Sequence, residues 1–161
     1  WILATLDKYD AKATFFCLGK NVEAYPDLYQ RIIDAGHRVG NHTYSHQKGW
    51  GMPTDRYVED VDFAADLIQS DLFRPPYARI TPAQTRALAQ RYRLIMWDII
   101  SRDYNRKISP ATCLRNVVPY LEGGSIVVFH DSVKAFRNMR YALPSTLEEI
   151  RRRGLHCARI E

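Results

Sequence analysis

The sequence has little cysteine and no long apolar run. Its three cysteines (Cys17, Cys113 and Cys157) are an odd number and stand far apart, which argues against a disulfide scaffold and a Cys-x-x-Cys metal site. No apolar stretch approaches the length of a membrane span. No segment interleaves basic residues with aromatic ones, so the net charge of +5 does not indicate a nucleic-acid groove. We therefore expect no membrane span and no nucleic-acid partner.

The composition is typical of one globular domain with a core of its own. Of the 161 residues, 46% are hydrophobic and 25% are charged. No linker, repeat or low-complexity segment divides the chain, so we assign residues 1–161 to a single domain. The sequence opens inside a helix-like pattern and shows no signal peptide. We expect that the natural protein has residues before Trp1, and we infer no compartment from this end.

Strand-like and helix-like segments alternate along the chain. The predicted strands cover residues 12–18, 38–42, 94–100, 125–129 and 155–160, with a short strand end at 73–77. The predicted helices cover residues 1–9, 26–33, 53–68 and 81–91, and two more start at Ser109 and Pro144. Such alternation is typical of βαβ units and a parallel sheet, so the predicted fold class is α/β.

Polar residues stand where four of these strands end. They are His42, Arg74, Asp98 and His130. Parallel α/β folds, barrel or open sheet, place their active sites at the carboxyl ends of the strands. The four residues therefore predict a functional site at that edge.

His42 and His46 have the spacing of metal ligands. Neutral imidazole is a common zinc ligand, and His-x3-His falls within the spacing that zinc sites use. In an extended strand the two residues would lie about 13 Å apart, whereas a helical turn brings them within roughly 5–6 Å. We therefore predict that the chain leaves a strand near Asn41 and curls through the next residues. The absence of His-Glu-x-x-His excludes the usual metalloprotease helix. The alternative is a polar loop with two surface histidines.

Four segments together resemble a known family. The segments Asn41–His46, Phe73–Tyr77, Trp97–Tyr104 and Ile126–Asp131, in this order, are similar to the motifs of the polysaccharide deacetylases, the carbohydrate esterases of the NodB homology domain. The resemblance implies a distorted (β/α) barrel, here without its first strand. It also implies removal of N-acetyl groups from N-acetylglucosamine in chitin, peptidoglycan or related glycans, and a cell-envelope or secreted location.

The resemblance further implies a role for six residues. His42 and His46 would bind a divalent metal, usually zinc, although such ligands also accept cobalt or nickel. Arg74 would orient the catalytic base and pair with Asp103. The backbone amide of Tyr77 would help to hold the oxyanion. His130 would be the general acid for the leaving amine, a task that suits imidazole because it titrates near neutrality. Asp131 either orients His130 or caps the loop.

The sequence also departs from the family pattern. It holds no Asp-Asp pair, which in the family supplies the catalytic base and the third metal ligand. We expect either that the sequence begins just after that motif or that the protein is a degenerate homologue. Ile100, Tyr104 and Ala78 stand where the family often has aspartate, tryptophan and glycine. The alternatives are therefore an inactive carbohydrate-binding homologue and an amide or imide hydrolase of the same fold.

Overall fold

The computed structural model describes residues 1–161, which divide into two compact units. Unit 1 consists of Trp1–Lys12 and Trp97–Ala158, and unit 2 consists of Ala13–Met96 and Arg159–Glu161. The assignment of the whole chain to one domain stays a prediction.

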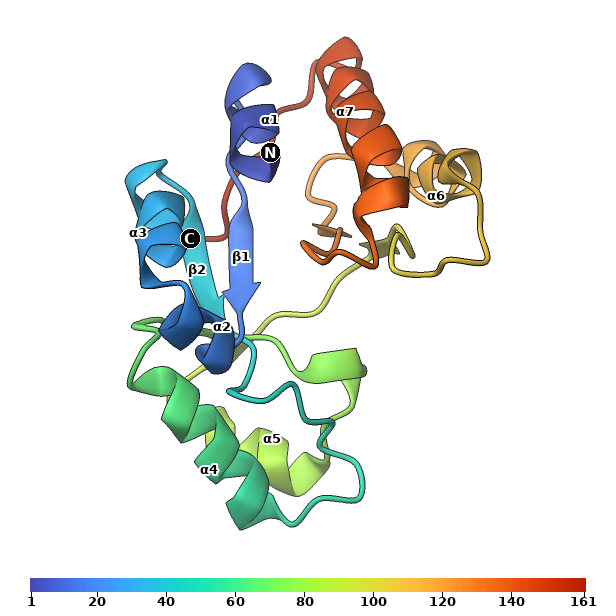
Figure 1. The fold of residues 1–161 in the computed structure, drawn as a ribbon. Coiled ribbons are helices and arrows are strands. Elements are labelled where there is room, and N and C mark those ends of the chain that lie inside the picture. The colour runs from blue at the N-terminus through green and yellow to red at the C-terminus, as the bar shows by residue number, and fades with distance from the viewer. The chain divides into compact units, whose positions relative to one another are not determined.

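Unit 2 is built on a parallel sheet of four strands in the order β1-β2-β3-β4. Strands β1 and β2 lie side by side in Figure 1. The strands are β1 (Thr14–Cys17), β2 (Arg38–Asn41), β3 (Leu72–Phe73) and β4 (Arg93–Leu94). The helices are α2 (Gly19–Ala24), α3 (Pro26–Asp34), α4 (Thr54–Ala65), the 3-10 turn η1 (Pro76–Ala78) and α5 (Pro82–Leu88). A buried cluster joins α4, β3 and α5 through Tyr57, Val61, Phe73 and Leu88. This core fixes the loops that follow β2 and β3.

Unit 1 is mainly helical and contains a parallel pair of short strands. The strands are β5 (Ile99–Ile100) and β6 (Val127–Val128). The helices are α1 (Ile2–Lys8), α6 (Pro110–Arg115), the 3-10 turn η2 (Val118–Tyr120) and α7 (Phe136–Arg152). Helices α6 and α7 lie against each other (Figure 1). Ile99, Val117 and Leu121 form a buried cluster beneath β5 and η2.

The start of the last helix was predicted wrongly. Pro144 lies inside α7 and does not open it. A proline in a helix interior costs about 3 kcal/mol because it removes a hydrogen bond and crowds the preceding turn. Against this, α7 buries one continuous face, formed by Asn138, Met139, Ala142, Leu143, Thr146 and Leu147. That helical spacing continues through the proline, and burial of this face outweighs the local penalty.

Two predicted strands are also corrected. Residues 94–100 form no single strand, because β4 ends at Leu94 in unit 2 and β5 begins at Ile99 in unit 1. Asp98 therefore precedes a strand, and its carboxylate accepts a hydrogen bond from the Ile126 amide at 2.8 Å. Residues 155–160 form no strand either. Instead, the segment makes isolated hydrogen bonds: the Cys157 carbonyl accepts the Lys12 amide at 3.2 Å, and the Ile160 amide donates to the Thr14 hydroxyl at 2.9 Å.

Two further expectations from the sequence concern disulfides and membrane-spanning segments. All three cysteines are free thiols, with Cys113 buried and the other two half-buried. Burial raises the pKa of the Cys113 thiol to about 11, which keeps it protonated and unreactive. None of the helices combines the length and the apolar character that crossing a bilayer requires.

Candidate functional site

The two histidines of the loop after β2 lie side by side, as the spacing predicted. β2 ends at Asn41, and the His42 amide donates to the Cys17 carbonyl of β1 at 2.9 Å. The chain then turns sharply, with positive φ at Thr43 (67°) and His46 (65°). The imidazole rings of His42 and His46 finish with their centroids 5.1 Å apart. A β-branched residue at positive φ is strained, so the surrounding contacts must hold this turn.

Asn41 and Thr43 supply those contacts. Both are fully buried. The Asn41 Nδ2 donates to the Val61 carbonyl of α4 at 3.0 Å, and its Oδ1 accepts the Thr43 amide at 2.8 Å. The Thr43 hydroxyl in turn accepts the His46 amide at 3.0 Å. A chain of hydrogen bonds therefore runs from α4 to the backbone of the second histidine.

This network predicts the effect of removing the Asn41 amide. Asn41→Ala leaves the buried Thr43 amide and Val61 carbonyl without these partners, so we expect a loss of about 1–3 kcal/mol in unfolding free energy. Urea denaturation would measure it. Gln69→Ala is the matched control, since the exposed Gln69 amide bonds only the Ala65 carbonyl. Equal stability of the two variants would contradict the proposed importance of the network.

A second support of the histidine loop is Asp60, which the sequence analysis missed. Its carboxylate accepts the Ser45 hydroxyl at 2.7 Å and the Ser45 amide at 3.2 Å. Its backbone carbonyl accepts the Tyr44 amide at 3.0 Å. Asp60 lies on α4, 15 residues beyond Ser45. The only sequence feature that could have identified it is its position on the helix face that lies toward the loop. It ties the turn to a rigid element.

The strand that follows in the sheet orients the first histidine. Nδ1 of His42 lies 2.5 Å from the backbone carbonyl of Arg74, just after β3. A carbonyl can only accept, so Nδ1 carries the proton and Nε2 is the nitrogen with the lone pair. Metal-binding histidines are commonly oriented by such a contact at the other ring nitrogen. His42 is therefore in the tautomer that binds a metal through Nε2.

The Arg74 side chain is held just as firmly. Its Nε donates to the Ile95 carbonyl at 3.1 Å, and a terminal nitrogen donates to the Met96 carbonyl at 3.0 Å. The guanidinium carbon lies 4.1 Å from the centre of the Phe16 ring. Burial lowers the pKa of Arg74 to about 10, which still leaves it cationic at neutral pH. A partly desolvated, fixed guanidinium is suited to orienting a carboxylate.

Tyr77 lies beside the second histidine. Its ring is 63% exposed and its centroid is 4.7 Å from that of His46. The residue adopts φ of 58°, and the turn bonds the amides of Ala78 and Arg79 to the carbonyls of Pro75 and Pro76. The Tyr77 amide takes part in neither of these two hydrogen bonds of the turn. Unit 2 therefore brings together four of the predicted site residues, namely His42, His46, Arg74 and Tyr77.

The two histidines are the candidate metal ligands of this site. Two adjacent imidazoles, one with its Nε2 lone pair fixed, suit zinc, cobalt or nickel. No group of three histidine, cysteine, aspartate or glutamate side chains in the structure could hold an ion. The residues present therefore fit part of a metal site, and metal binding by His42 and His46 stays a prediction.

In unit 1, Asp103 and His130 form a pair. Asp103 is fully buried. One carboxylate oxygen lies 2.7 Å from Nδ1 of His130, and the other accepts the His130 amide at 2.7 Å. A carboxylate at Nδ1 favours the tautomer with the proton there and stabilises the imidazolium, which leaves Nε2 for proton transfer. The residue that orients His130 is thus Asp103, because both of its oxygens contact His130, whereas no hydrogen bond joins the Asp131 carboxylate to the imidazole.

The loop that carries Asp103 is anchored from α7. The buried Asn138 donates to the carbonyls of Asp103 and Asn105 at 3.0 and 3.1 Å. The Asp103 amide donates to the Ser101 hydroxyl, and the Tyr104 ring packs edge-on against His130 at 4.8 Å. The pairing of Asp103 with Arg74 stays a prediction, since the two residues belong to different units.

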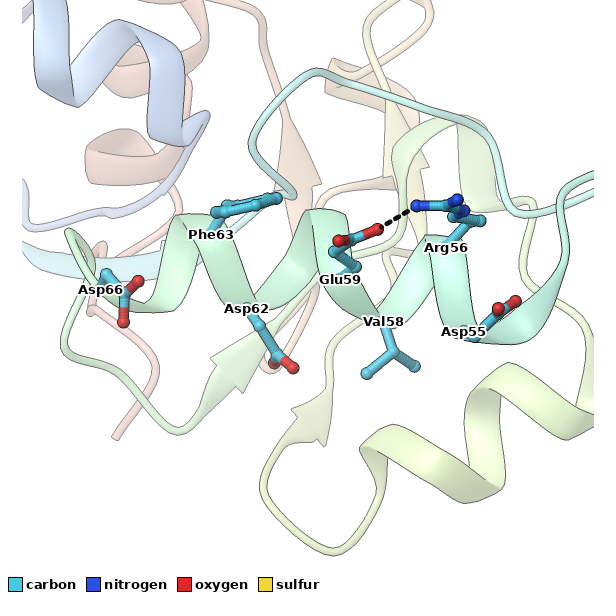
Figure 2. Close-up of a pocket in the computed structure, with 7 residues that line it drawn as sticks. All are labelled: Asp55, Arg56, Val58, Glu59, Asp62, Phe63 and Asp66. Carbon is cyan, nitrogen blue, oxygen red and sulfur yellow. Dashed lines mark hydrogen bonds and ion pairs between the residues drawn. The ribbon is translucent and has the colours of Figure 1, made fainter.

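The depression on α4 is a separate feature. Figure 2 shows its lining, which consists of Asp55, Arg56, Val58, Glu59, Asp62, Phe63 and Asp66. Arg56 and Glu59 form an exposed ion pair at 2.9 Å, a surface interaction of little energetic weight. None of the predicted site residues lines this depression. His37 is also separate from the site: it is buried, and its Nδ1 accepts the Ala13 amide at 3.3 Å.

Comparison with known proteins identifies the family. The sequence profile described as polysaccharide deacetylase matches residues 1–97, which include both histidines of the loop. The chain belongs to the polysaccharide deacetylase family. A peptidoglycan-N-acetylglucosamine deacetylase of Bacillus cereus is 31% identical over 81% of this chain and 50% of its own length. The chain spans about half the length of the curated relatives that it matches.

Solved structures of polysaccharide deacetylases confirm the predicted α/β fold class. The Bc1960 peptidoglycan N-acetylglucosamine deacetylase superposes with a TM-score of 0.92 at 26% identity, over 99% of this chain and 78% of that one. A family member from Bacillus anthracis described as a pseudoenzyme, BA3943, gives a TM-score of 0.83 at 25% identity over 99% of this chain and 57% of its own. The fold thus occurs in a protein named as a deacetylase and in one described as a pseudoenzyme.

Proposed function

We propose that this chain is a metal-dependent deacetylase domain that removes N-acetyl groups from N-acetylglucosamine units of a glycan. The observation that carries the proposal is the Asp103–His130 pair, with both contacts at 2.7 Å. A buried carboxylate is expensive to desolvate unless it is well paired. Glycan binding alone has no use for a buried carboxylate aimed at an imidazole, whereas amide hydrolysis needs a proton donor for the leaving nitrogen.

In this proposal the residues of unit 2 bind and orient. His42 and His46 would hold a divalent ion, zinc by preference, which when bound polarises an amide carbonyl and acidifies water. The Tyr77 amide would donate a hydrogen bond to the carbonyl oxygen of the acetyl group as negative charge develops there. Arg74 would fix the direction of the catalytic carboxylate through its remaining N–H groups. The carboxylate itself would be the aspartate implied by the family pattern.

The residues of unit 1 would transfer the proton. Nε2 of His130 would give its proton to the leaving amine, because an amide nitrogen leaves poorly as an anion. Asp103 would hold Nδ1–H throughout and stabilise the imidazolium form. Tyr104, packed on the His130 ring, would limit the positions that the ring can take. The names of the curated relatives favour peptidoglycan or chitin as the glycan and an envelope or secreted location.

The direct test is acetate release. We expect the full-length protein, loaded with zinc, to release acetate from N-acetylglucosamine oligomers or from peptidoglycan. Chelation should stop the reaction, and zinc should restore it. Stoichiometric zinc and glycan binding without acetate release would contradict a catalytic role.

A second candidate is an inactive carbohydrate-binding homologue. Two observations favour it: the sequence holds no Asp-Asp pair, and the similar BA3943 protein is described as a pseudoenzyme. The acetate assay separates the two candidates, because both predict glycan binding and only one predicts product.

A further inference from the structure

The loop between His46 and α4 is held by a buried amide. Gln84 of α5 is fully buried, and its Nε2 donates to the carbonyls of Gly49 and Met52 at 2.9 and 3.0 Å. Its Oε1 accepts the Thr81 amide at 2.9 Å, completing a capping box. One side chain thus satisfies three backbone groups. The loop is therefore fixed, although it has no regular secondary structure.

The loop also approaches the segment after Tyr77 very closely. The Gly49 amide donates to the Arg79 carbonyl at 2.7 Å. A Cβ atom at Gly49 would lie 2.2 Å from the Gln84 Oε1 and 2.8 Å from the Arg79 carbonyl oxygen. Any other residue there would push the loop away. Only a glycine fits this close approach to Gln84 and Arg79. The approach aligns the loop with the turn that carries Tyr77.

At the tip of this fixed loop, Trp50 is presented to solvent. It is 55% exposed, its indole Nε1 donates to the Ile80 carbonyl at 3.3 Å, and the Arg79 guanidinium lies 5.1 Å from the ring centre. The ring is oriented by two contacts and is still not buried by the core. A large aromatic side chain that is fixed and exposed is typical of a recognition surface.

The position of Trp50 relates it to the candidate site. It follows His46 by four residues, and its contacts Arg79 and Ile80 come directly after the turn whose Tyr77 ring packs on His46. Trp50 therefore borders the histidine loop, both by its position in the sequence and through its contacts with Arg79 and Ile80.

We propose that Trp50 is a stacking platform for a sugar ring of a β-1,4-linked N-acetylglucosamine chain, at a subsite next to the sugar that is deacetylated. A pyranose presents apolar C–H groups on its faces and hydroxyls at its rim. The apolar face of the indole can pack on these C–H groups, and the Arg79 guanidinium supplies hydrogen-bond donors for hydroxyl or acetamide oxygens. The inference rests on the proposed function for the identity of the glycan and adds chain-length selectivity.

The test is a comparison of binding to the N-acetylglucosamine tetramer and monomer by calorimetry. In Trp50→Ala we expect the dissociation constant for the tetramer to rise about three- to tenfold, with binding of the monomer unchanged. Trp50→Phe, which keeps an aromatic face, should retain most of the tetramer affinity. Phe63→Ala is the matched control, an equally exposed aromatic (56%) on α4, and should change neither. Thermal unfolding of each variant checks that it is folded.

Two results would overturn the inference: unchanged tetramer affinity in Trp50→Ala, or an equal loss for tetramer and monomer. Because the binding measurement does not depend on turnover, it tests the inference separately from the proposed function. Tetramer binding that depends on Trp50, without acetate release, would keep the subsite and favour the inactive homologue.

Discussion

His42→Ala is expected to lower zinc affinity by more than about 100-fold and to abolish acetate release. The reason is that His42 is one of two adjacent imidazoles, and its Nε2 lone pair is fixed by the contact between Nδ1 and the Arg74 carbonyl. Removing an oriented ligand loses both the bond and the preorganisation, and even changes in the groups that orient ligands typically lower affinity 10- to 100-fold. Metal content after dialysis against a defined zinc buffer measures the first effect directly.

The matched control is His156→Ala, since this exposed histidine lies in unit 1 and has no assigned role. It should retain the zinc content and activity of the unmodified protein. His46→Ala should behave like His42→Ala. Retention of stoichiometric zinc by both loop variants would show that the metal binds elsewhere, and the assignment of His42 and His46 would be wrong.

Much of the candidate site could be predicted because its signals are local. The His42 and His46 spacing is only compatible with a shared ion if the chain turns, and the structure has that turn with the rings 5.1 Å apart. Likewise, Thr81 and Ser109 precede prolines and accept amides from the first turns of α5 and α6, as expected of N-caps. Each of these inferences needs only a few neighbouring residues.

The groups that orient the site could not be predicted in the same way. Asn41 bonds Val61, Asp60 bonds Ser45, and Asp103 bonds His130 across 20, 15 and 27 residues of chain. Such contacts depend on how elements pack, and no periodicity or short motif encodes them. The resemblance named Asp103 and paired it with Arg74, a pairing that stays a prediction, but it did not indicate that both carboxylate oxygens contact His130.

Long-range packing also explains the errors in the elements. Pro144 is a local stop signal, yet the buried face of α7 runs past it. The apolar run at residues 94–100 reads as one strand, yet its two ends pair with different partners, Leu94 with Phe73 and Ile99 with Val127. In both places tertiary contacts outweigh the local preference.

His130→Ala is expected to lower the turnover number about 10²- to 10⁴-fold while zinc content stays unchanged. The residue lies outside the histidine loop and is oriented by Asp103, so its loss removes a proton donor and no assigned metal ligand. Loss of zinc in this variant would mean that His130 is a ligand and that the proposed role is wrong. Kinetics and metal analysis on the same preparation distinguish the two.

Asp103→Asn tests the same pair without removing the imidazole. The carboxylate now accepts from the His130 amide, from Nδ1 and from the Tyr104 amide at 3.0 Å. An asparagine has one acceptor oxygen, and its NH2 group would face a donor at one of these positions. The neutral amide therefore leaves one of these donors unpaired and supplies no negative charge to stabilise an imidazolium, so turnover should fall towards the value of His130→Ala. Asp7→Asn, at an exposed position of α1 in the same unit, is the control that should stay active. If Asp103→Asn kept full turnover, the buried pair would be structural, and the argument that favours catalysis over glycan binding would lose its support.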